Sequence, residues 1–271
     1  MPFFYLPMQN QLDLLDQWTD QVHEALKGRP PGVLNLHHSH GTVQYMFKTK
    51  PEDTQAVYLS KSKRTLIVEL AQRDYEERFL HIAAQQRERL LKDQSRGRPC
   101  SASVLYHALE AVYENLKPDR KELVQPYILP DKLFIQSWLD QPYSGREFFP
   151  ADPLIFTKKG TRVRSRIERI MADTLDRMEI PYLYEYPLTL PSHKTIYPDF
   201  TILDVRERTT VLFEHFGMMN DILYRQQALN KIEQYLQAGF YPGYDLLYTF
   251  EGSSQGFDTR SFEFLIKNRF S

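Results

Sequence analysis

The sequence has little cysteine, no long apolar run and almost no net charge, and each scarcity excludes a class of protein. Its 271 residues include one cysteine, Cys100, so an intramolecular disulfide is excluded and a cytoplasmic protein is expected. Its longest apolar stretches are shorter than the roughly 18 residues that a membrane helix requires. The first residues also lack the pattern of a signal peptide. No association with a membrane is therefore expected.

The total charge gives no support for a polyanionic partner. Thirty-four Lys and Arg residues stand against 35 Asp and Glu residues, for a net charge of -1. The composition, 42% hydrophobic and 25% charged, excludes disorder of the whole chain. Local stretches differ from the total, because residues 158–169 hold six Lys or Arg residues against one Glu. Residues 61–98 likewise hold ten basic residues against six acidic ones.

Changes of pattern divide the chain into two regions, residues 1–125 and 126–271. The first is predicted to be an α+β region that binds DNA or a partner protein. Its apolar spacing predicts helices at 11–27, 61–94 and 102–116. Two strands around a turn are predicted at 33–49 and a third strand at 56–60. Five prolines in residues 117–152 predict a connecting lead-in with one short helix near 131–140.

The second region is predicted to be α/β, with the element order αβββαβ. Helices are expected at 162–179 and 220–238. Three strands are expected between them, at 183–190, 195–203 and 209–216, and a fourth follows at 244–250. The middle strands are apolar on both faces, which is typical of a sheet covered by helices on both sides.

Two acidic residues lie inside these apolar strands. Asp199 follows Pro198, and Glu214 lies between Phe213 and His215. Charges inside apolar strands are costly unless they are paired or bound to a metal. Hard oxygen ligands without a Cys or His cluster favour Mg²⁺ or Mn²⁺. A third acid, Glu168, lies on the preceding helix inside the basic stretch.

The stretch YPDFTIL…FEHFGMMND, preceded by the helix with Glu168, resembles the PD-(D/E)XK nuclease superfamily. Over about residues 155–251 the sequence is similar to a family of uncharacterised bacterial proteins with a YPDF…EHxGMM core. It is also similar to the nuclease tails of some superfamily 1 helicases. The resemblance implies a restriction-endonuclease-like αβββαβ core with a mixed central sheet. It also implies metal-dependent hydrolysis of phosphodiester bonds.

Site residues follow from the same resemblance. Asp199, Glu214 and the backbone carbonyl of His215 are expected to bind the metal, and Glu168 to hold a second metal or its water. The basic stretch is expected to contact the phosphates of DNA. The residues expected in that contact are Lys158, Lys159, Arg162, Arg164 and Arg166.

One position departs from the family pattern. The superfamily normally has a lysine two residues after the glutamate, and Phe216 stands there. A stripe on the helix at 220–238 offers a substitute, because Lys231 lies on it at helical spacing with Tyr224, Ala228 and Tyr235. Lys231 is therefore the expected catalytic lysine, with Lys194 in reserve. An apolar stripe lies beside it, formed by Ile222, Leu229, Ile232 and Leu236.

Structural interpretations remain open beside the functional ones. Glu168 matches a capping box that begins at Ser165, and Asp199 could be a turn residue after Pro198. Glu214 could pair with an arginine of the basic stretch, and Lys231 could be solvated.

Two further interpretations concern residues outside this group. Glu185 is expected at an exposed strand edge rather than in the site. A solvated turn is favoured over a zinc site for His37, His38 and His40.

These observations predict a Mg²⁺- or Mn²⁺-dependent deoxyribonuclease, with genome defence or mobile-element biology as the expected setting. The alternative is a catalytically inactive, nuclease-like protein that binds DNA or serves as a scaffold. DNA and either a protein partner or a second copy of the chain are the expected partners.

Overall fold

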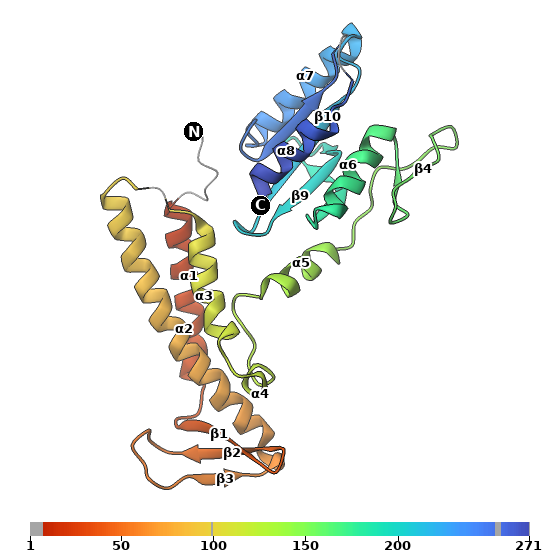
Figure 1. Ribbon diagram of the computed structural model, residues 1–271. Coiled ribbons are helices and arrows are strands. Elements are labelled where there is room, and N and C mark those ends of the chain that lie inside the picture. Colours follow the sequence, from red (N-terminus) through yellow and green to blue (C-terminus); the bar gives the residue numbers. More distant parts are fainter. Residues whose placement is uncertain (1–7, 99, 253–255, 271) are drawn as a thin grey trace. The chain divides into compact units, whose positions relative to one another are not determined.

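A computed structural model describes residues 8–98, 100–252 and 256–270 (Figure 1). Within these ranges the chain is mixed α/β, with eight α-helices and several small sheets, one of them mixed. Contacts divide it into two compact units, one ending at Pro130 and one beginning at Asp131. The sequence pattern places the division at 125/126. None of the helices in the described ranges combines the length and the apolar character that a membrane span requires.

The N-terminal unit is built on long helices and a small sheet. Its elements are α1 (Met8–Lys27), β1 (Val33–Ser39), β2 (Thr42–Lys48), β3 (Val57–Leu59), α2 (Arg64–Ser95), α3 (Ala102–Glu114) and α4 (Pro118–Lys121), with a 3-10 turn at Lys61–Lys63. The helices and strands predicted for this region are present within a few residues, and α4 is an addition. Helix α2 runs for 32 residues because no Gly or Pro interrupts it.

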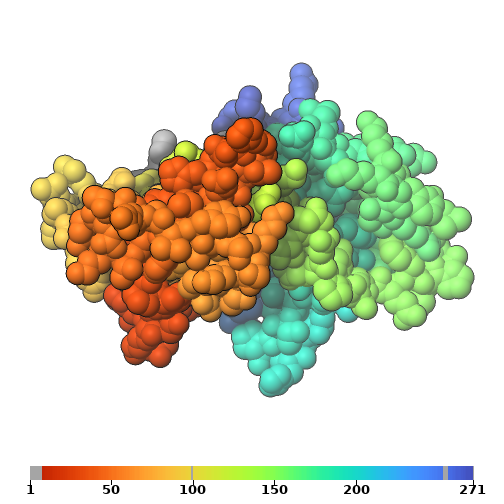
Figure 2. All heavy atoms as spheres, turned by 90° about the horizontal axis from the view of Figure 1, so that it is seen from below, coloured from red at the N-terminus to blue at the C-terminus, as the bar shows by residue number. Residues whose placement is uncertain are grey.

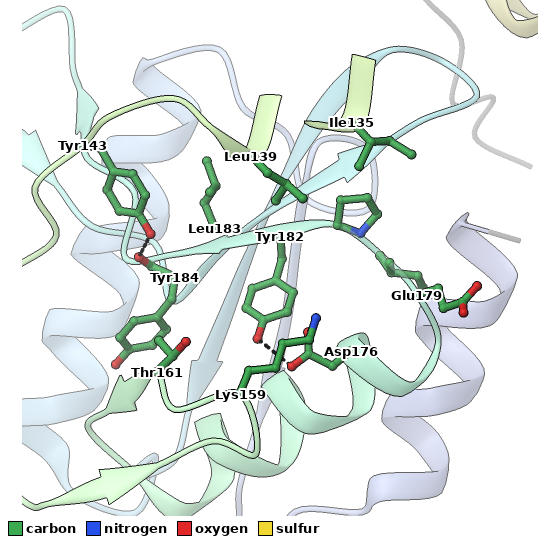
Figure 3. A pocket seen from close by; sticks show the side chains of 12 residues that line it. Ile135, Leu139, Tyr143, Lys159, Thr161, Asp176, Glu179, Tyr182, Leu183 and Tyr184 are labelled. Carbon is green, nitrogen blue, oxygen red and sulfur yellow. Dashed lines mark hydrogen bonds and ion pairs between the residues drawn. The ribbon is translucent and has the colours of Figure 1, made fainter. Parts of the chain in front are cut away.

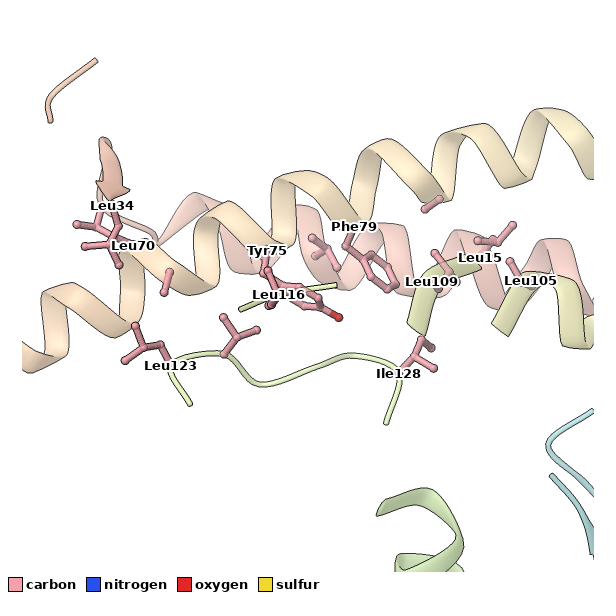
Figure 4. Packing of buried hydrophobic residues seen from close by; sticks show 14 of the residues in the cluster. Leu15, Leu34, Leu70, Tyr75, Phe79, Leu105, Leu109, Leu116, Leu123 and Ile128 are labelled. Carbon is pink, nitrogen blue, oxygen red and sulfur yellow. The ribbon is translucent and has the colours of Figure 1, made fainter. Parts of the chain in front are cut away.

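Packing of α1, α2 and α3 forms the core of this unit (Figure 4). Its buried side chains include Leu15 from α1, Tyr75 and Phe79 from α2, and Leu105 and Leu109 from α3. The antiparallel order β1-β2-β3 forms the sheet, and the β1–β2 turn uses positive φ angles at His40 and Gly41. The strands lie at the surface of the unit, where Figure 2 shows their atoms in orange.

The C-terminal unit has a four-stranded sheet with helices on both faces. Its elements are α5 (Asp131–Leu139), β4 (Ile155–Phe156), β5 (Arg162–Val163), α6 (Arg166–Arg177), β6 (Tyr182–Tyr184), β7 (Leu188–Thr189), β8 (Thr195–Ile196), β9 (Phe200–Asp204), β10 (Thr209–Phe216), α7 (Ile222–Gln237), β11 (Leu246–Phe250) and α8 (Thr259–Phe270). The strand order is β11-β10-β9-β6, with β10 and β11 parallel and the other pairs antiparallel. The mixed sheet is thus confirmed.

Alternate residues of the central strands pack on opposite faces of this sheet. On one face Phe200, Phe213 and other strand residues pack against α6 and α8. On the other face Leu212 and Leu246 pack with Tyr235 of α7, and Leu203 packs with α5. Strand β9 is buried along its whole length, as its apolar sequence predicts.

Two of the predicted strands are each divided in the structure. Residues 183–190 form β6 and β7, because Glu185 adopts a positive φ of 47° and Pro187 follows it. Residues 195–203 form β8 and β9, divided around Pro198, which cannot donate to a ladder. The β7–β8 pair makes a hairpin outside the main sheet. The sequence pattern also missed the β4–β5 pair and α8, which buries Phe262 and Ile266.

Candidate active site

Strand register places Asp199 and Glu214 opposite each other. Strands β9 and β10 are antiparallel with Phe200 opposite Phe213, so the next pair outward is Asp199 and Glu214. Opposite residues of neighbouring strands direct their side chains to the same face. Because Phe200 and Phe213 face α6 and α8, the two carboxyl groups face the α7 side. The structure therefore brings these two predicted site residues together.

Helix α7 covers Glu214 with two hydrogen-bond donors. The Lys231 ammonium lies 2.6 Å from Oε1 of Glu214 and donates to the carbonyl of Tyr197 at 3.0 Å. The Tyr235 hydroxyl also donates to Oε1. Glu214 is 2% exposed, and burial raises its pKa although Lys231 acts in the opposite direction. Burial lowers the pKa of Lys231, but the carboxylates of Glu214 and Asp199 outweigh it, so the net pKa is raised and the ammonium stays charged.

The orientation of α7 explains these contacts. Asp221 caps the helix by accepting from the N–H of Tyr224. The stripe that includes Ala228, Lys231 and Tyr235 turns inward, while the neighbouring apolar stripe is largely exposed, with Ile222 72% exposed. The solvated interpretation of Lys231 and the Glu214–arginine pair are therefore both wrong.

Asp199 is half-buried at the start of β9 and accepts a hydrogen bond at Oδ2 from the N–H of His215, at 2.7 Å. Burial raises its pKa well above the usual range, and the neighbouring charge of Glu214 adds to the effect. The Asp199 side chain therefore accepts a hydrogen bond from β10. A residue that served only the turn after Pro198 would not need this contact. Burial and then the Asp199 charge also raise the pKa of Tyr224.

Glu168 combines a capping role with a place near the two strand acids. Its N–H donates to Oγ of Ser165 at 3.1 Å, so the capping interpretation is correct for the backbone. Its carboxylate accepts from the Tyr184 hydroxyl at 2.6 Å and from the N–H of Arg164 at 2.9 Å. The negative charge of Glu168 is among the causes that raise the pKa of Asp199 and of Glu214. Glu168 therefore interacts electrostatically with both.

The side chains of His215 and Phe216 serve packing. The His215 ring lies on the face opposite Glu214, 2.9 Å from the Thr249 hydroxyl and against Phe257. Burial lowers the pKa of His215. Phe216 is 4% exposed and places no cation beside the carboxylates.

The oxygen atoms present fit a hard divalent cation in part. In the described ranges Oδ1 of Asp199, Oε2 of Glu214 and Oε1 of Glu168 have no hydrogen bond, and none is sealed from solvent. The carbonyl of His215 points to the same side as its N–H, toward Asp199. No three His, Cys, Asp or Glu side chains converge as a metal cluster in those ranges. Asp199, Glu214 and the His215 carbonyl are therefore the donors that a metal would use, completed by water.

The basic stretch is only partly available to a ligand. Lys158, Lys159 and Arg166 are exposed, although Lys159 pairs with Asp176 at 2.7 Å. Arg162 donates to the carbonyls of Asp152 and Pro153. The remaining residue of the predicted phosphate contact, Arg164, is committed to the fold.

Arg164 connects three segments of the unit. Its guanidinium pairs with Glu185 at 2.7 Å and Asp152 at 2.8 Å. It also donates to two carbonyls of the lead-in and lies 4.2 Å from the Phe148 ring. Glu185 is 6% exposed, so the expectation of an exposed edge position is wrong. The ion pair explains why this acid is buried.

Replacing Arg164 with methionine is expected to lower the free energy of unfolding by about 3 kcal/mol, because Glu185 is left buried without its cation. Arg166→Met, an exposed neighbour, is the matched control and is expected to change stability by less than about 0.5 kcal/mol. Urea unfolding monitored by circular dichroism measures both. Equal stability of the two variants would contradict a structural role for Arg164.

A cavity of about 510 Å³ lies beside edge strand β6, between α5 and α6 (Figure 3). Tyr182 donates to Asp176 in its wall, and Tyr143 donates to the carbonyl of Tyr184. Neither Asp199 nor Glu214 lines it. The cavity is therefore separate from the carboxylates.

Sequence reasoning missed two hydroxyl groups that hold the acids, those of Tyr184 and Tyr235. The signal for Tyr235 is its spacing of four residues from Lys231 on one helical stripe. Tyr184 has no comparable signal, since its contact with Glu168 depends on how α6 packs on β6. In the N-terminal unit His38 pairs with Asp119 at 2.8 Å, and His37 and His40 are exposed.

Comparison with known proteins adds no relative: no protein-family model, curated protein or solved structure matches the chain.

Proposed function

We propose that the C-terminal unit is a Mg²⁺- or Mn²⁺-dependent nuclease of the PD-(D/E)XK type that hydrolyses phosphodiester bonds of DNA. The observation that carries the proposal is the position of Lys231, whose ammonium contacts Glu214, which register places opposite Asp199. In the family, a lysine two residues after the glutamate supplies this positive charge. Here Lys231 of α7 supplies it instead. The αβββαβ order of α6, β6, β9, β10, α7 and β11 supports the same assignment.

The residues of the site have separate roles in this proposal. A bound Mg²⁺ or Mn²⁺ supplies Lewis acidity toward a phosphoryl oxygen and lowers the pKa of water. Lys231 and Tyr235 both bind Oε1 of Glu214, which leaves Oε2 to bind a ligand. Because Lys231 stays charged, it stabilises negative charge that develops on the phosphoryl group. Glu168 accepts a hydrogen bond from Tyr184, and its proposed role is to orient a water or a second cation.

Exposed basic side chains within residues 158–166 are the proposed phosphate contacts. Lys158 and Arg166 remain available, and Lys159 and Arg162 are partly available because each already has a partner. Such contacts weaken as salt rises, because bound phosphates release counterions. The internal bonds of Arg164 remove it from this set.

Plasmid and linear DNA incubated with the full chain and Mg²⁺ or Mn²⁺ test the proposal. Cleavage is expected with either metal, none with EDTA, and none with Asp199→Ala. Wild-type protein that binds DNA without cleaving it under either metal would support the inactive alternative. Cleavage that survives Asp199→Ala would place the chemistry elsewhere.

A further inference from the structure

Three aromatic side chains continue the row of carboxylates across the sheet. Strands β10 and β11 are parallel, with Glu214 opposite Tyr248 and Phe216 opposite Phe250. Residues in register share a face, as Leu212 and Leu246 do in the core below them. Tyr248, Phe216 and Phe250 therefore lie on the Asp199–Glu214 face, and we refer to these three as the aromatic platform.

Exposure of the aromatic platform increases from β10 to β11 and then along β11 toward its C-terminal end. Phe216 is 4% exposed, Tyr248 is 36% exposed and Phe250 is 65% exposed. The Phe216 and Tyr248 rings lie 6.0 Å apart at 60°, so the buried ring supports the exposed one. Strand β11 is the last strand of the sheet in the described ranges. A supported ring and a free ring are thus presented beside the carboxylates.

We propose that the aromatic platform stacks an unpaired base of the nucleic acid whose phosphate lies at Asp199 and Glu214, so that the preferred substrate is single-stranded. This inference rests on the proposed function and names its substrate class. Bases in a duplex are stacked on both sides, whereas an unpaired base presents its π-face to an aromatic ring. Neighbouring strands are ~4.8 Å apart, so Tyr248 lies within the reach of one nucleotide from Glu214.

The chemistry of the platform favours a base over a phosphate. Tyr248 and Phe250 offer flat aromatic surface, whereas the exposed cations proposed as phosphate contacts belong to the segment before α6 and to the first turn of that helix. This arrangement separates a cationic side, suited to the backbone, from a stacking side, suited to bases. Phe216 occupies the position that the family reserves for lysine, and its ring packs against Tyr248.

Fluorescence anisotropy of the full chain tests this inference. The probes are a labelled oligothymidine of about 20 nucleotides and a blunt duplex of the same length, both in EDTA to prevent cleavage. Phe250→Ala and Tyr248→Ala are each expected to weaken oligothymidine binding about 10-fold, with little change for the duplex. Phe264→Ala is the matched control, because this phenylalanine is 72% exposed on α8, which packs on the opposite face.

Each outcome decides the inference. The inference would be overturned if the two variants lost affinity equally for both DNAs or lost none for either. It would also be overturned if the wild type did not bind oligothymidine. A changed particle mass for Phe250→Ala with unchanged DNA binding would also overturn it and assign the platform to a second copy. Loss specific to oligothymidine in a protein without cleavage activity would retain the platform and reject the nuclease. Metal-dependent cleavage that Phe250→Ala leaves unchanged would retain the nuclease and reject the platform.

Discussion

Replacing Lys231 with methionine is expected to lower the rate of DNA cleavage by about 10²–10³-fold, because a preorganised cation is removed from the site. The ammonium now binds Glu214 and stays charged. Methionine retains the apolar stem of the side chain, so packing changes little, but stability falls because Glu214 is left buried without its cation. Initial rates with Mn²⁺ and linear DNA measure the effect.

Lys194→Met is the matched control for this prediction. Lys194 is exposed, and its ammonium donates to the side chain of Gln234 at 3.0 Å. Its replacement is expected to leave the rate within about two-fold, since surface changes of this kind have small effects. Thermal unfolding checks that Lys231→Met is folded. A rate that falls with Lys194→Met but not with Lys231→Met would transfer the catalytic role to the reserve lysine.

Replacing Asp199 with asparagine is expected to abolish cleavage and, without metal, to stabilise the protein by about 1 kcal/mol. Burial and the nearby Glu214 raise the pKa of Asp199 above its value in the unfolded chain. The folded protein therefore retains this proton to higher pH than the unfolded chain does. Stability falls as pH rises from the ordinary carboxyl range through the raised pKa. Asparagine removes that loss, which raises Tm at neutral pH by about 4 °C.

Bound metal is expected to make the wild type more stable than Asp199→Asn, the opposite of the order without metal. A cation that binds the folded wild type at about 100 times its Kd adds about 2.7 kcal/mol of stability. The neutral asparagine is expected to lose most of this gain. Thermal unfolding with EDTA and with Mn²⁺ separates the two effects, and Asp258→Asn, an exposed carboxyl in the same unit, is the control. A wild type that Mn²⁺ does not stabilise would argue against a metal at this site.

The local fold was largely predictable because hydrophobic period and chain breakers act over short distances. The length of α2 follows from the lack of Gly and Pro, and the burial of β9 follows from its apolar sequence. The predictions from sequence failed where a contact between residues distant in the chain determines burial. Glu185 reads as an exposed edge residue, yet Arg164, 21 positions earlier, makes its burial tolerable.

The orientation of α7 shows the same limit within the site. This helix carries two neighbouring stripes, and the hydrophobic effect alone favours burial of the one with Ile222 and Leu229. The structure buries the stripe with Lys231 and Tyr235 instead, because a buried carboxylate needs charged and hydroxyl donors. Side-chain period identified the stripe, and only packing on β10 selected it.

The sequence by itself determined the two regions, the order of elements and the identity of the acids, since these depend on neighbours along the chain. Tertiary structure decided which charges meet. It set Lys231 against Glu214 and committed Arg164 to Glu185. It also placed Tyr248 and Phe250 on the carboxylate face. The near absence of net charge was uninformative for the same physical reason: electrostatic energy depends on the distances and burial of particular pairs, which a total does not contain.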